Sequence, residues 1–592
     1  MIRTPLRPLA RILPARLRGE NTDRIEADNI RQRHEEMRDR ARARAESRLL
    51  FVAVLFLAGF SVIGARMTVL ASSEAVEPQA SASSASIVAQ RANIVDRNGR
   101  VLATNLITNS LYAQPKLMVE PERAAKELAA IFPDLKEERL LKDFTGARKF
   151  LWVKKKISPE QMQAVHDIGE PGLLFGPREM RLYPNGRLAA HVLGGASFGR
   201  EGVHSAEVIG TAGVEKAFDD FLRDPALEGA PLRLSIDMTI QSAMRRVLDG
   251  GMKLMNAKGA TAVLMKVDTG EVVSMVSLPD FDPNTRPRDL IEGDPSDSPL
   301  FNRAVQGVYE LGSTFKIFAA AQALELKLVN PTTMLDTKGP MRWGRYKIRD
   351  FSNYGDTLSV TDVIVKSSNI GTARMALNIG AKRQKEFLGS LGFFEPSPVE
   401  LVEAPGAKPL LPKKWSDIST MTVSYGHGMA ASPLHLASAY ATVVGGGTLV
   451  KPTLLKVDSV KPGPRVMSEQ TSRQAREMLH QVVERGTASF MKGTGYMVGG
   501  KTGTADKPKP RGGYHKDKVI ATFASAFPMN DPQYVLIVTL DEPSENSGKK
   551  PRRTAGWTAV PVAAEIVKRT APLLGLRPIE TGPATGVTTV KY

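Results

Sequence analysis

Three serine–lysine pairs in this chain have the S-x-x-K spacing that nucleophilic catalysis can use: Ser313 with Lys316, Ser489 with Lys492, and Ser547 with Lys550. Residues i and i+3 lie on one face of a helix, so the lysine amine can take the serine proton, the minimum for covalent acyl transfer. Ser313 alone begins an apolar stretch, which predicts a helix to about Leu326 with the serine at the positive end of its dipole. The other two pairs lie in Gly-rich or Lys-rich stretches, so we predict Ser313 as the nucleophile and Lys316 as its base.

Two further motifs follow Ser313 along the chain. Ser367-Ser368-Asn369 reads S-x-N, and Lys501-Thr502-Gly503-Thr504 reads K-T-G-T. The order S-x-x-K, S-x-N, K-T-G is the signature of serine β-lactamases and penicillin-binding proteins. On these motifs the chain, over roughly residues 88–575, resembles the class B penicillin-binding proteins, and most closely their division-specific branch.

The resemblance implies how the first two motifs act. Ser313 attacks the carbonyl of a D-Ala-D-Ala peptide bond, and Lys316 takes its proton. Ser367 relays a proton to the leaving D-alanine, and Asn369 hydrogen-bonds either Lys316 or the substrate amide. Such a base must be a neutral amine, which requires burial or a nearby positive charge to lower the lysine pKa.

The resemblance also implies roles for the third motif. Lys501 holds positive potential over the cleft and lowers the pKa of the catalytic lysine. Thr502, Gly503 and Thr504 form the substrate-binding strand, and the two threonine hydroxyls receive the terminal carboxylate of the substrate. The backbone N–H groups of Ser313 and Thr504 form the oxyanion hole, whose donors are typically worth about 3–4 kcal/mol each.

Each of these motifs has a competing interpretation. Ser544-Glu545-Asn546 is a second S-x-N, of the kind that occurs in exposed turns. Gly495–Thr502 also matches the nucleotide-binding pattern G-x-x-x-x-G-K-[ST]. That loop must lead into a helix, whereas the residues that follow, GTADKPKPRGG, contain two prolines and three glycines. We therefore favour the K-T-G interpretation.

The amino terminus predicts a membrane anchor. Residues 1–48 carry 13 Arg against 8 Asp and Glu, a net charge of 13 − 8 = +5. The uncharged run Leu49–Ala65 then spans ~26 Å as a helix, and continuing to Ala71 makes it long enough for a bilayer. There is no Lys or Arg between Met67 and Gln90, so the positive-inside rule places residues 1–48 in the cytoplasm and the rest outside. Binding of nucleic acid by the arginines, and cleavage near Ala71, are the less favoured alternatives.

The remaining pattern predicts a fold of the α/β class (α+β type). Five strand-like runs, two before Ser313 and three after Ser367, predict one antiparallel sheet covered by helices, the plan of the penicillin-binding transpeptidases: Ala260–Val267, Glu271–Ser277, Val498–Ala505, Val519–Phe527 and Tyr534–Leu540. The predicted organisation is a basic cytoplasmic tail, a transmembrane helix, a linker, an elongated β-rich pedestal, a transpeptidase domain and a C-terminal tail, at 1–48, 49–71, 72–86, 87–228, 229–575 and 576–592.

Within the pedestal, the stretch around Asn98-Gly99 predicts a hairpin. Four charged residues are expected to hold its strands together as ion pairs rather than to act in catalysis: Arg91, Asp96, Arg178 and Glu215. With no cysteine and eight histidines that form no ligand spacing, we predict no metal and no cofactor.

The predicted anchor indicates a single-pass protein of the cytoplasmic (inner) membrane, and the resemblance implies that it cross-links peptidoglycan stem peptides in the periplasm at the division septum. The resemblance implies β-lactams as covalent inhibitors, and lipid-linked glycan strands delivered by an FtsW-type polymerase among other divisome membrane proteins. The alternatives are the elongation-specific class B enzyme, a β-lactam sensor and a β-lactamase. A sensor has extra membrane helices, and a class A hydrolase carries an E-x-x-L-N water-activating motif, which residues 370–430 lack.

Overall fold

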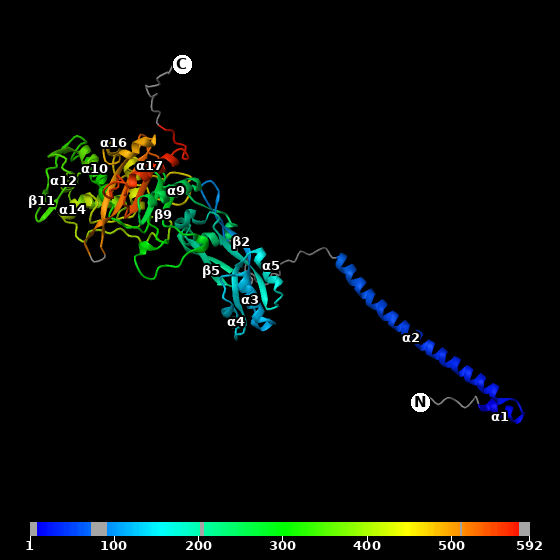
Figure 1. Cartoon of the computed structure of the whole chain (residues 1–592). Coiled ribbons are helices and arrows are strands. Elements are labelled where there is room, and N and C mark those ends of the chain that lie inside the picture. The colour runs from blue at the N-terminus through cyan, green and yellow to red at the C-terminus, as the bar shows by residue number, and fades with distance from the viewer. Residues whose placement is uncertain (1–8, 73–90, 202–205, 510–511, 579–592) are drawn as a thin grey trace, which may run out of the picture. The chain divides into compact units, whose positions relative to one another are not determined.

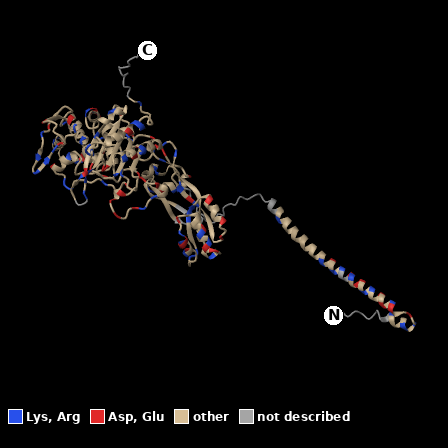
Figure 2. Ribbon diagram, viewed as in Figure 1, with Lys and Arg blue, Asp and Glu red and all other residues tan. Residues whose placement is uncertain are grey.

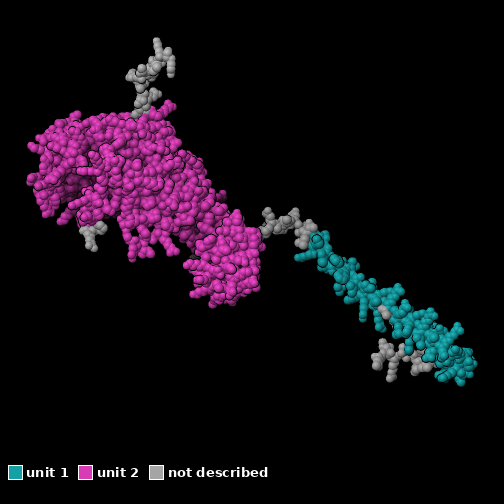
Figure 3. Space-filling view, in the orientation of Figure 1, with its two compact units in different colours: residues 1–87 teal, residues 88–592 magenta. Residues whose placement is uncertain are grey.

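The structure of the chain, a computed structural model, describes residues 9–72, 91–201, 206–509 and 512–578 (Figure 1). The chain divides into two compact units, residues 1–87 and residues 88–592 (Figure 3). The predicted linker at 72–86 and the tail at 576–592 lie outside the described residues, apart from Ser72 and residues 576–578.

The first unit consists of α1 (Leu9–Leu17) and the 51-residue helix α2 (Thr22–Ser72). Charged side chains follow one another along the first half of α2 and then give way to uncharged ones (Figure 2). The apolar side chains of Leu49–Ala65 are exposed. Among the described residues α2 is the one helix long and apolar enough to cross a membrane, which fits the predicted single span.

The second unit begins with a sheet in which β2 pairs with β1, β3 and β4, all antiparallel. The elements up to residue 227 are β1 (Ile94–Val95), β2 (Val101–Ala113), α3 (Pro121–Ile131), α4 (Glu137–Phe144), β3 (Leu151–Ile157), α5 (Pro159–Asp167), β4 (Leu173–Leu182), α6 (Ala190–Leu193), β5 (Gly195–Glu201), β6 (Ala206–Ala212), α7 (Gly213–Ala217) and α8 (Asp219–Arg223). Helices α3, α4 and α5 bury Leu128, Phe144 and Val165 in one core with Leu111 of β2. The lysines at 154–156 lie in β3, where Leu111 of β2 pairs with Lys154.

Buried ion pairs join β4 and the residues before β1 to helices α7 and α8, and they include the predicted Arg91 and Glu215. Glu215, 0 % exposed, accepts hydrogen bonds from Arg91 Nε and Arg181 Nε, both at 2.7 Å. Arg91 also donates to Asp219 at 2.7 Å. Asp96 pairs locally with Arg100 at 3.2 Å, where the predicted hairpin turns between β1 and β2. Arg178 lies over aromatic rings, 4.0 Å from the centroid of Phe198 and 5.0 Å from that of Trp152.

The predicted five-stranded antiparallel sheet is confirmed, with the order β14-β15-β16-β8-β9. Its strands are β8 (Gly259–Lys266), β9 (Val272–Leu278), β14 (Gly499–Pro508), β15 (Tyr514–Phe527) and β16 (Tyr534–Asp541). The central β16 is buried along its whole length, as an apolar strand between two neighbours must be. β8, which precedes the helical segment in the chain, thus pairs with β16, which follows it. The helical segment therefore begins and ends at the same sheet.

Helices cover both faces of this sheet (Figure 1). Helix α9 packs with α17 on one face, so closely that a Cβ on Gly251 would lie 2.6 Å from Val562. Helices α15 and α16 pack on the other face, towards the helical segment that carries Ser313. The helices are α9 (Met238–Leu254), α10 (Lys316–Glu325), α11 (Val360–Val365), α12 (Asn369–Ile379), α13 (Ala381–Ser390), α14 (Asp417–Ser424), α15 (Pro433–Val444), α16 (Glu469–Arg485) and α17 (Ala559–Thr570).

The second unit also contains short strands that join its parts. The short strand β7 (Leu232–Arg233) pairs in parallel with β1, and the core around β8 and β16 continues through Ile94 to Val214. Two small antiparallel sheets lie in the segment before α11: β10 (Met334–Asp336) pairs with β13 (Thr357–Ser359), and β11 (Met341–Trp343) and β12 (Tyr346–Ile348), which lie between these two strands in the chain, form a hairpin. The residues that follow this hairpin contact the S-x-N motif, through Arg349 and Asp350.

Candidate active site

Ser313 lies in a single 3-10 turn, η6 (Gly312–Phe315), which leads into α10. Its side chain is half-buried and therefore reachable, whereas Lys316, the first residue of α10, is 0 % exposed. The buried Tyr440 hydroxyl donates to the carbonyl of Thr314 at 2.9 Å and fixes the turn from beneath. The turn therefore presents the serine at the surface and its predicted base in the interior.

Strand β14 lies against this turn so closely that glycine is required on both sides. A Cβ on Gly503 would lie 2.2 Å from the carbonyl oxygen of Leu311 and 2.8 Å from Cγ2 of Thr314. Gly312 has φ +54°, and a Cβ there would lie 2.9 Å from the carbonyl oxygen of Thr504. A side chain at either position would separate the K-T-G strand from the serine turn, so these two glycines allow Ser313 and Thr504 to lie side by side.

The hydroxyl of Ser367 joins the two motif lysines. Its Oγ accepts a hydrogen bond from Lys316 Nζ at 3.0 Å and another from Lys501 Nζ at 2.9 Å. Lys316 Nζ also donates to the Ser367 carbonyl at 2.5 Å. Ser367 itself has φ +62°, a backbone conformation that is costly for a residue other than glycine and that is concentrated at functional sites.

Burial lowers the pKa of both motif lysines and so favours their neutral forms. It lowers the pKa of Lys501 from 10.5 to about 7. It also lowers the pKa of Lys316 well below its ordinary value, and the positive charge of Lys501 lowers it further, while Asp350 acts in the opposite direction. The sequence prediction named burial or Lys501 as the cause, and the structure contains both, with burial the larger. A neutral Lys316 amine is free to accept a proton.

The other predicted substrate-binding residues have partners of their own. The hydroxyl of Thr502 lies 2.6 Å from that of Thr487. Thr504 Oγ1 accepts from the Ala555 backbone N–H at 3.0 Å, which leaves its proton to donate. Asn369 Nδ2 donates to the carbonyl of Arg349 at 2.9 Å, which leaves its side-chain oxygen as an acceptor.

Sequence analysis missed Asp350, which lies between β12 and α11. Its carboxylate accepts hydrogen bonds from the Ser368 hydroxyl at 2.7 Å and from the backbone N–H groups of Asn369 and Ile370 at 2.6 and 3.0 Å. The sequence offered a weak signal only, because a lone aspartate in an irregular segment has many possible roles. Its partners lie 18 to 20 residues away, beyond the reach of any local pattern.

Sequence analysis also missed a cluster of side chains around Glu310, three residues before the predicted nucleophile Ser313. Glu310 accepts hydrogen bonds from the Gly428 N–H at 2.8 Å and the Tyr514 hydroxyl at 3.0 Å, and it pairs with His427 at 3.1 Å. These bonds draw together the segment before Ser313, the loop after α14 and the start of β15. Burial and the carboxylate of Glu310 raise the pKa of Tyr514 to about 12, so this phenol is neutral and donates.

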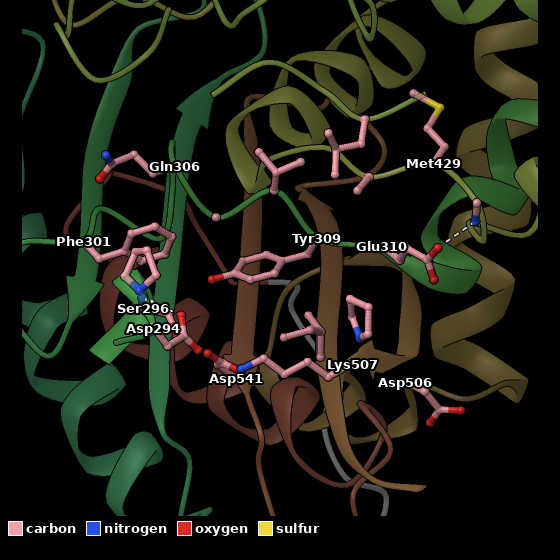
Figure 4. A pocket seen from close by; sticks show the side chains of 18 residues that line it. Asp294, Ser296, Phe301, Gln306, Tyr309, Glu310, Met429, Asp506, Lys507 and Asp541 are labelled. Carbon is pink, nitrogen blue, oxygen red and sulfur yellow. Dashed lines mark hydrogen bonds and ion pairs between the residues drawn. The ribbon is translucent and has the colours of Figure 1, made fainter. Parts of the chain in front are cut away.

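Behind Glu310 lies a cavity of about 470 Å³ (Figure 4). Tyr309, Met429 and Ile520 supply apolar walls, and Lys507 reaches across to Asp541 at 2.9 Å. The predicted motif residues are not part of its lining, so this cavity is a neighbour of the candidate site and not the site itself.

The competing motifs are placed where they cannot form such a site. Ser489 and Ser547 are exposed, and Lys492 pairs with Glu484 at 3.6 Å on the surface. Gly495–Thr502 does not lead into a helix, because Gly499–Pro508 forms β14. The nucleotide-binding interpretation is therefore excluded by the strand. Within the described ranges no group of three or more His, Asp or Glu side chains could hold a metal.

Comparison with known families identifies two regions of the chain. Residues 260–568 match the family described as "Penicillin binding protein transpeptidase domain", and residues 86–225 match "Penicillin-binding Protein dimerisation domain". The first match spans more than half of the chain and includes all three motifs.

Individual proteins give the same picture. The "Probable peptidoglycan D,D-transpeptidase FtsI" of Caulobacter vibrioides is 35% identical over 498 residues, with 82% of each chain covered. "Stage V sporulation protein D" of Bacillus subtilis is 31% identical over 527 residues, which cover 83% of this chain and 79% of that protein. The crystal structure of Penicillin Binding Protein 2X from Streptococcus thermophilus superposes with a TM-score of 0.66, covers 82% of this chain and 80% of that one, and at 21% identity shares the fold.

Proposed function

The chain belongs to the family of penicillin-binding protein transpeptidases, as a class B peptidoglycan D,D-transpeptidase, and we propose that it cross-links stem peptides through an acyl-enzyme on Ser313 during septum formation. The observation that carries this proposal is the hydroxyl of Ser367 held between the buried amines of Lys316 and Lys501, at 3.0 and 2.9 Å. This arrangement joins a base to a proton relay beside a half-buried serine.

In the first half-reaction, Ser313 Oγ attacks the carbonyl carbon between the two D-alanines as its proton passes to Lys316. The backbone N–H groups of Ser313 and Thr504 stabilise the oxyanion. The C–N bond then breaks, and the proton held by Lys316 reaches the leaving D-alanine nitrogen through the Ser367 hydroxyl. Because Ser367 Oγ already accepts from Lys316 Nζ, this transfer needs no rearrangement of the site.

In the second half-reaction, an amine of another stem peptide attacks the ester carbonyl and loses a proton to the Ser367 and Lys316 pair. The new amide C–N bond forms, the ester C–O bond breaks, and Lys316 returns a proton to the departing Ser313 Oγ. A hydrolase would need a carboxylate to activate water at this stage. Two of the acids after the S-x-N motif have partners elsewhere in the fold: Glu400 accepts from Thr453 and Leu454, and one oxygen of Glu403 accepts from Gly213. This supports transfer over hydrolysis and makes the β-lactamase alternative unfavourable.

Thr502, Gly503 and Thr504 are proposed to bind the substrate, with Lys501 supplying positive potential near its terminal carboxylate. Thr504 Oγ1 retains a proton to donate, because Ala555 N–H occupies only its acceptor side. Asn369 is proposed to hydrogen-bond either Lys316 or the substrate amide. No cofactor takes part, since both proton transfers use side chains of the chain itself.

The septal role rests on the relative named FtsI, while the relative named for sporulation stage V marks a different cellular role in the same family. We therefore propose division over elongation, with an FtsW-type polymerase and other divisome proteins as membrane partners. Depletion in a rod-shaped host should give filaments or branched cells with blocked septa. Round cells that still divide would favour the elongation enzyme.

The proposed domain organisation keeps the predicted boundaries, with a basic cytoplasmic tail at 1–48, a membrane span at 49–71, a linker at 72–86, a pedestal at 87–228, a transpeptidase domain at 229–575 and a C-terminal tail at 576–592. The catalytic domain is then in the periplasm. The one described helix able to cross a membrane supports a synthase over a sensor with several spans.

Labelling with a fluorescent penicillin tests the nucleophile. The full-length protein in detergent should take up one equivalent and retain it, because no activated water reaches the ester. Ser313→Ala should abolish labelling, while the exposed controls Ser489→Ala and Ser547→Ala should label like the wild type. Labelling of Ser313→Ala would refute the site, and rapid turnover of penicillin by the wild type would instead favour a hydrolase.

A further inference from the structure

Asp350 binds the start of helix α12 with both carboxylate oxygens. Oδ1 accepts from the backbone N–H groups of Asn369 and Ile370 at 2.6 and 3.0 Å, and Oδ2 accepts from the Ser368 hydroxyl at 2.7 Å. A carboxylate at a helix N-terminus is favoured by the unpaired N–H groups and by the dipole of the helix. This one comes from a separate segment, after strand β12, and so ties that segment to the S-x-N motif.

These bonds fix the backbone directly beside Ser367. Ser368, whose hydroxyl donates to Asp350, is also the N-cap of α12 and accepts from the Gly371 N–H at 3.0 Å. Ser367 precedes it with φ +62°, a conformation that persists only when its surroundings determine it. Asp350 therefore helps to hold the Ser367 hydroxyl at the position where both lysines reach it.

Asp350 also provides negative charge at the site. The charged groups that act on the buried Lys316 amine are Lys501, which disfavours its ammonium form, and Asp350, which favours it. The first turn of α10 contains no acidic residue. When Lys316 takes the proton of Ser313, a cation forms in the interior opposite another lysine, and the carboxylate of Asp350 lowers the free energy of that cation.

We propose that Asp350 is a positioning residue for acyl transfer, whose carboxylate holds the Ser367 turn in place and stabilises the ammonium that forms on Lys316 beside Lys501. The proposal rests on the proposed function, since it assumes that Lys316 accepts the proton of Ser313. A residue that only capped α12 would affect stability and the rate constant but would not change how the rate depends on pH.

The test compares Asp350→Asn, Asp350→Ala and the control Asp336→Asn in the full-length protein. Asparagine keeps the acceptor for the two backbone N–H groups but removes the charge, whereas alanine removes both. Asp336 lies in the same segment and also contacts α12, through Arg374, but it is exposed. The measurements are the second-order rate constant of acylation by a fluorescent penicillin from about pH 5 to about pH 9 and the midpoint of thermal unfolding.

Asp350→Asn is expected to unfold at nearly the wild-type temperature but to acylate about tenfold more slowly at neutral pH. The acid side of its pH profile should move to lower pH, because without the carboxylate Lys316 loses its proton more readily. Asp350→Ala should show the same pH shift with a larger loss of rate, and Asp336→Asn should match the wild type.

An unshifted pH profile in Asp350→Asn, whatever its rate, would overturn the proposal, as would an equal effect of Asp336→Asn. Both results leave the proposed function intact as long as the wild type is labelled on Ser313. Failure of the wild type to label, in contrast, would refute the proposed function itself.

Discussion

Replacing Gly503 by alanine should disable the site without unfolding the protein. The new Cβ would lie 2.2 Å from the carbonyl oxygen of Leu311 and 2.8 Å from Cγ2 of Thr314. Ordinary contacts between such atoms are about 3.5 Å, so β14 and the serine turn must separate by roughly 1 Å. Both clashing atoms belong to the buried turn that carries Ser313, and neither is the end of a long flexible side chain, so the strain cannot be relieved locally.

The expected cost in stability is about 1–3 kcal/mol, as for other overpacked sites. The expected cost in activity is larger, because a misplacement of about 1 Å between nucleophile and oxyanion donor can lower the rate by roughly 10²-fold. The assay is the second-order rate constant of acylation by a fluorescent penicillin, with the thermal midpoint measured on the same sample. The acylation rate should therefore fall far more than the small shift in midpoint would explain.

Gly250→Ala is the matched control, since Gly250 is exposed in α9 and a Cβ there would meet nothing within 4 Å. It should acylate at the wild-type rate and be no less stable, because alanine favours a helix over glycine. If Gly503→Ala acylated as fast as this control, the close approach of β14 would not be what positions Ser313, and the reasoning would be refuted.

Three further predictions follow from burial and charge. Because burial lowers the pKa of Lys501 from 10.5 to about 7, the unfolded state binds more protons between these values, so Lys501 should add about 3–5 kcal/mol to the free energy of unfolding from neutral pH to about pH 10. The lowered pKa of Lys316 contributes to the same rise, so Lys501→Met should reduce the rise in denaturant titrations without abolishing it. Glu215→Gln removes the negative charge that neutralises the guanidinium groups of Arg91 and Arg181, and it should lower the free energy of unfolding by about 3–5 kcal/mol in calorimetry while Ser313 is still labelled. Asp219→Asn, at the edge of the same network, is the control, and an equal loss of stability in this variant would argue against a buried charge shared through Glu215. A reporter fused after Tyr592 should be active only outside the cytoplasm, given the arginine-rich tail before the apolar run, and cytoplasmic activity would reverse the topology.

Local patterns in the sequence were sufficient to predict the three motifs, the strands of the main sheet and the candidate membrane-spanning helix. The S-x-x-K, S-x-N and K-T-G motifs are short, and the strands of the main sheet are apolar runs whose bounds differ from the structure by a few residues at most, except that β14 and β15 extend into the loop between them. The 17-residue uncharged run required no tertiary information, because bilayer thickness alone sets the length of a spanning helix. These features depend on neighbours in the chain, which a sequence displays directly.

The chemistry of the site depended on residues far apart in the sequence. Ser367 and Lys501 are 134 residues apart, yet their atoms lie at 2.9 Å because the sheet pairs strands from either side of the helical segment. Burial, which lowers the pKa of both lysines, arises only when that segment packs on the sheet. The same folding brings Asp350 to the S-x-N motif and leaves the competing serines on the surface. The sequence identified the candidate groups, and the tertiary structure decided which of them are in contact. Proton transfer requires donor and acceptor atoms within about 3 Å of one another and lysine amines that are shielded from water, and packing sets both conditions.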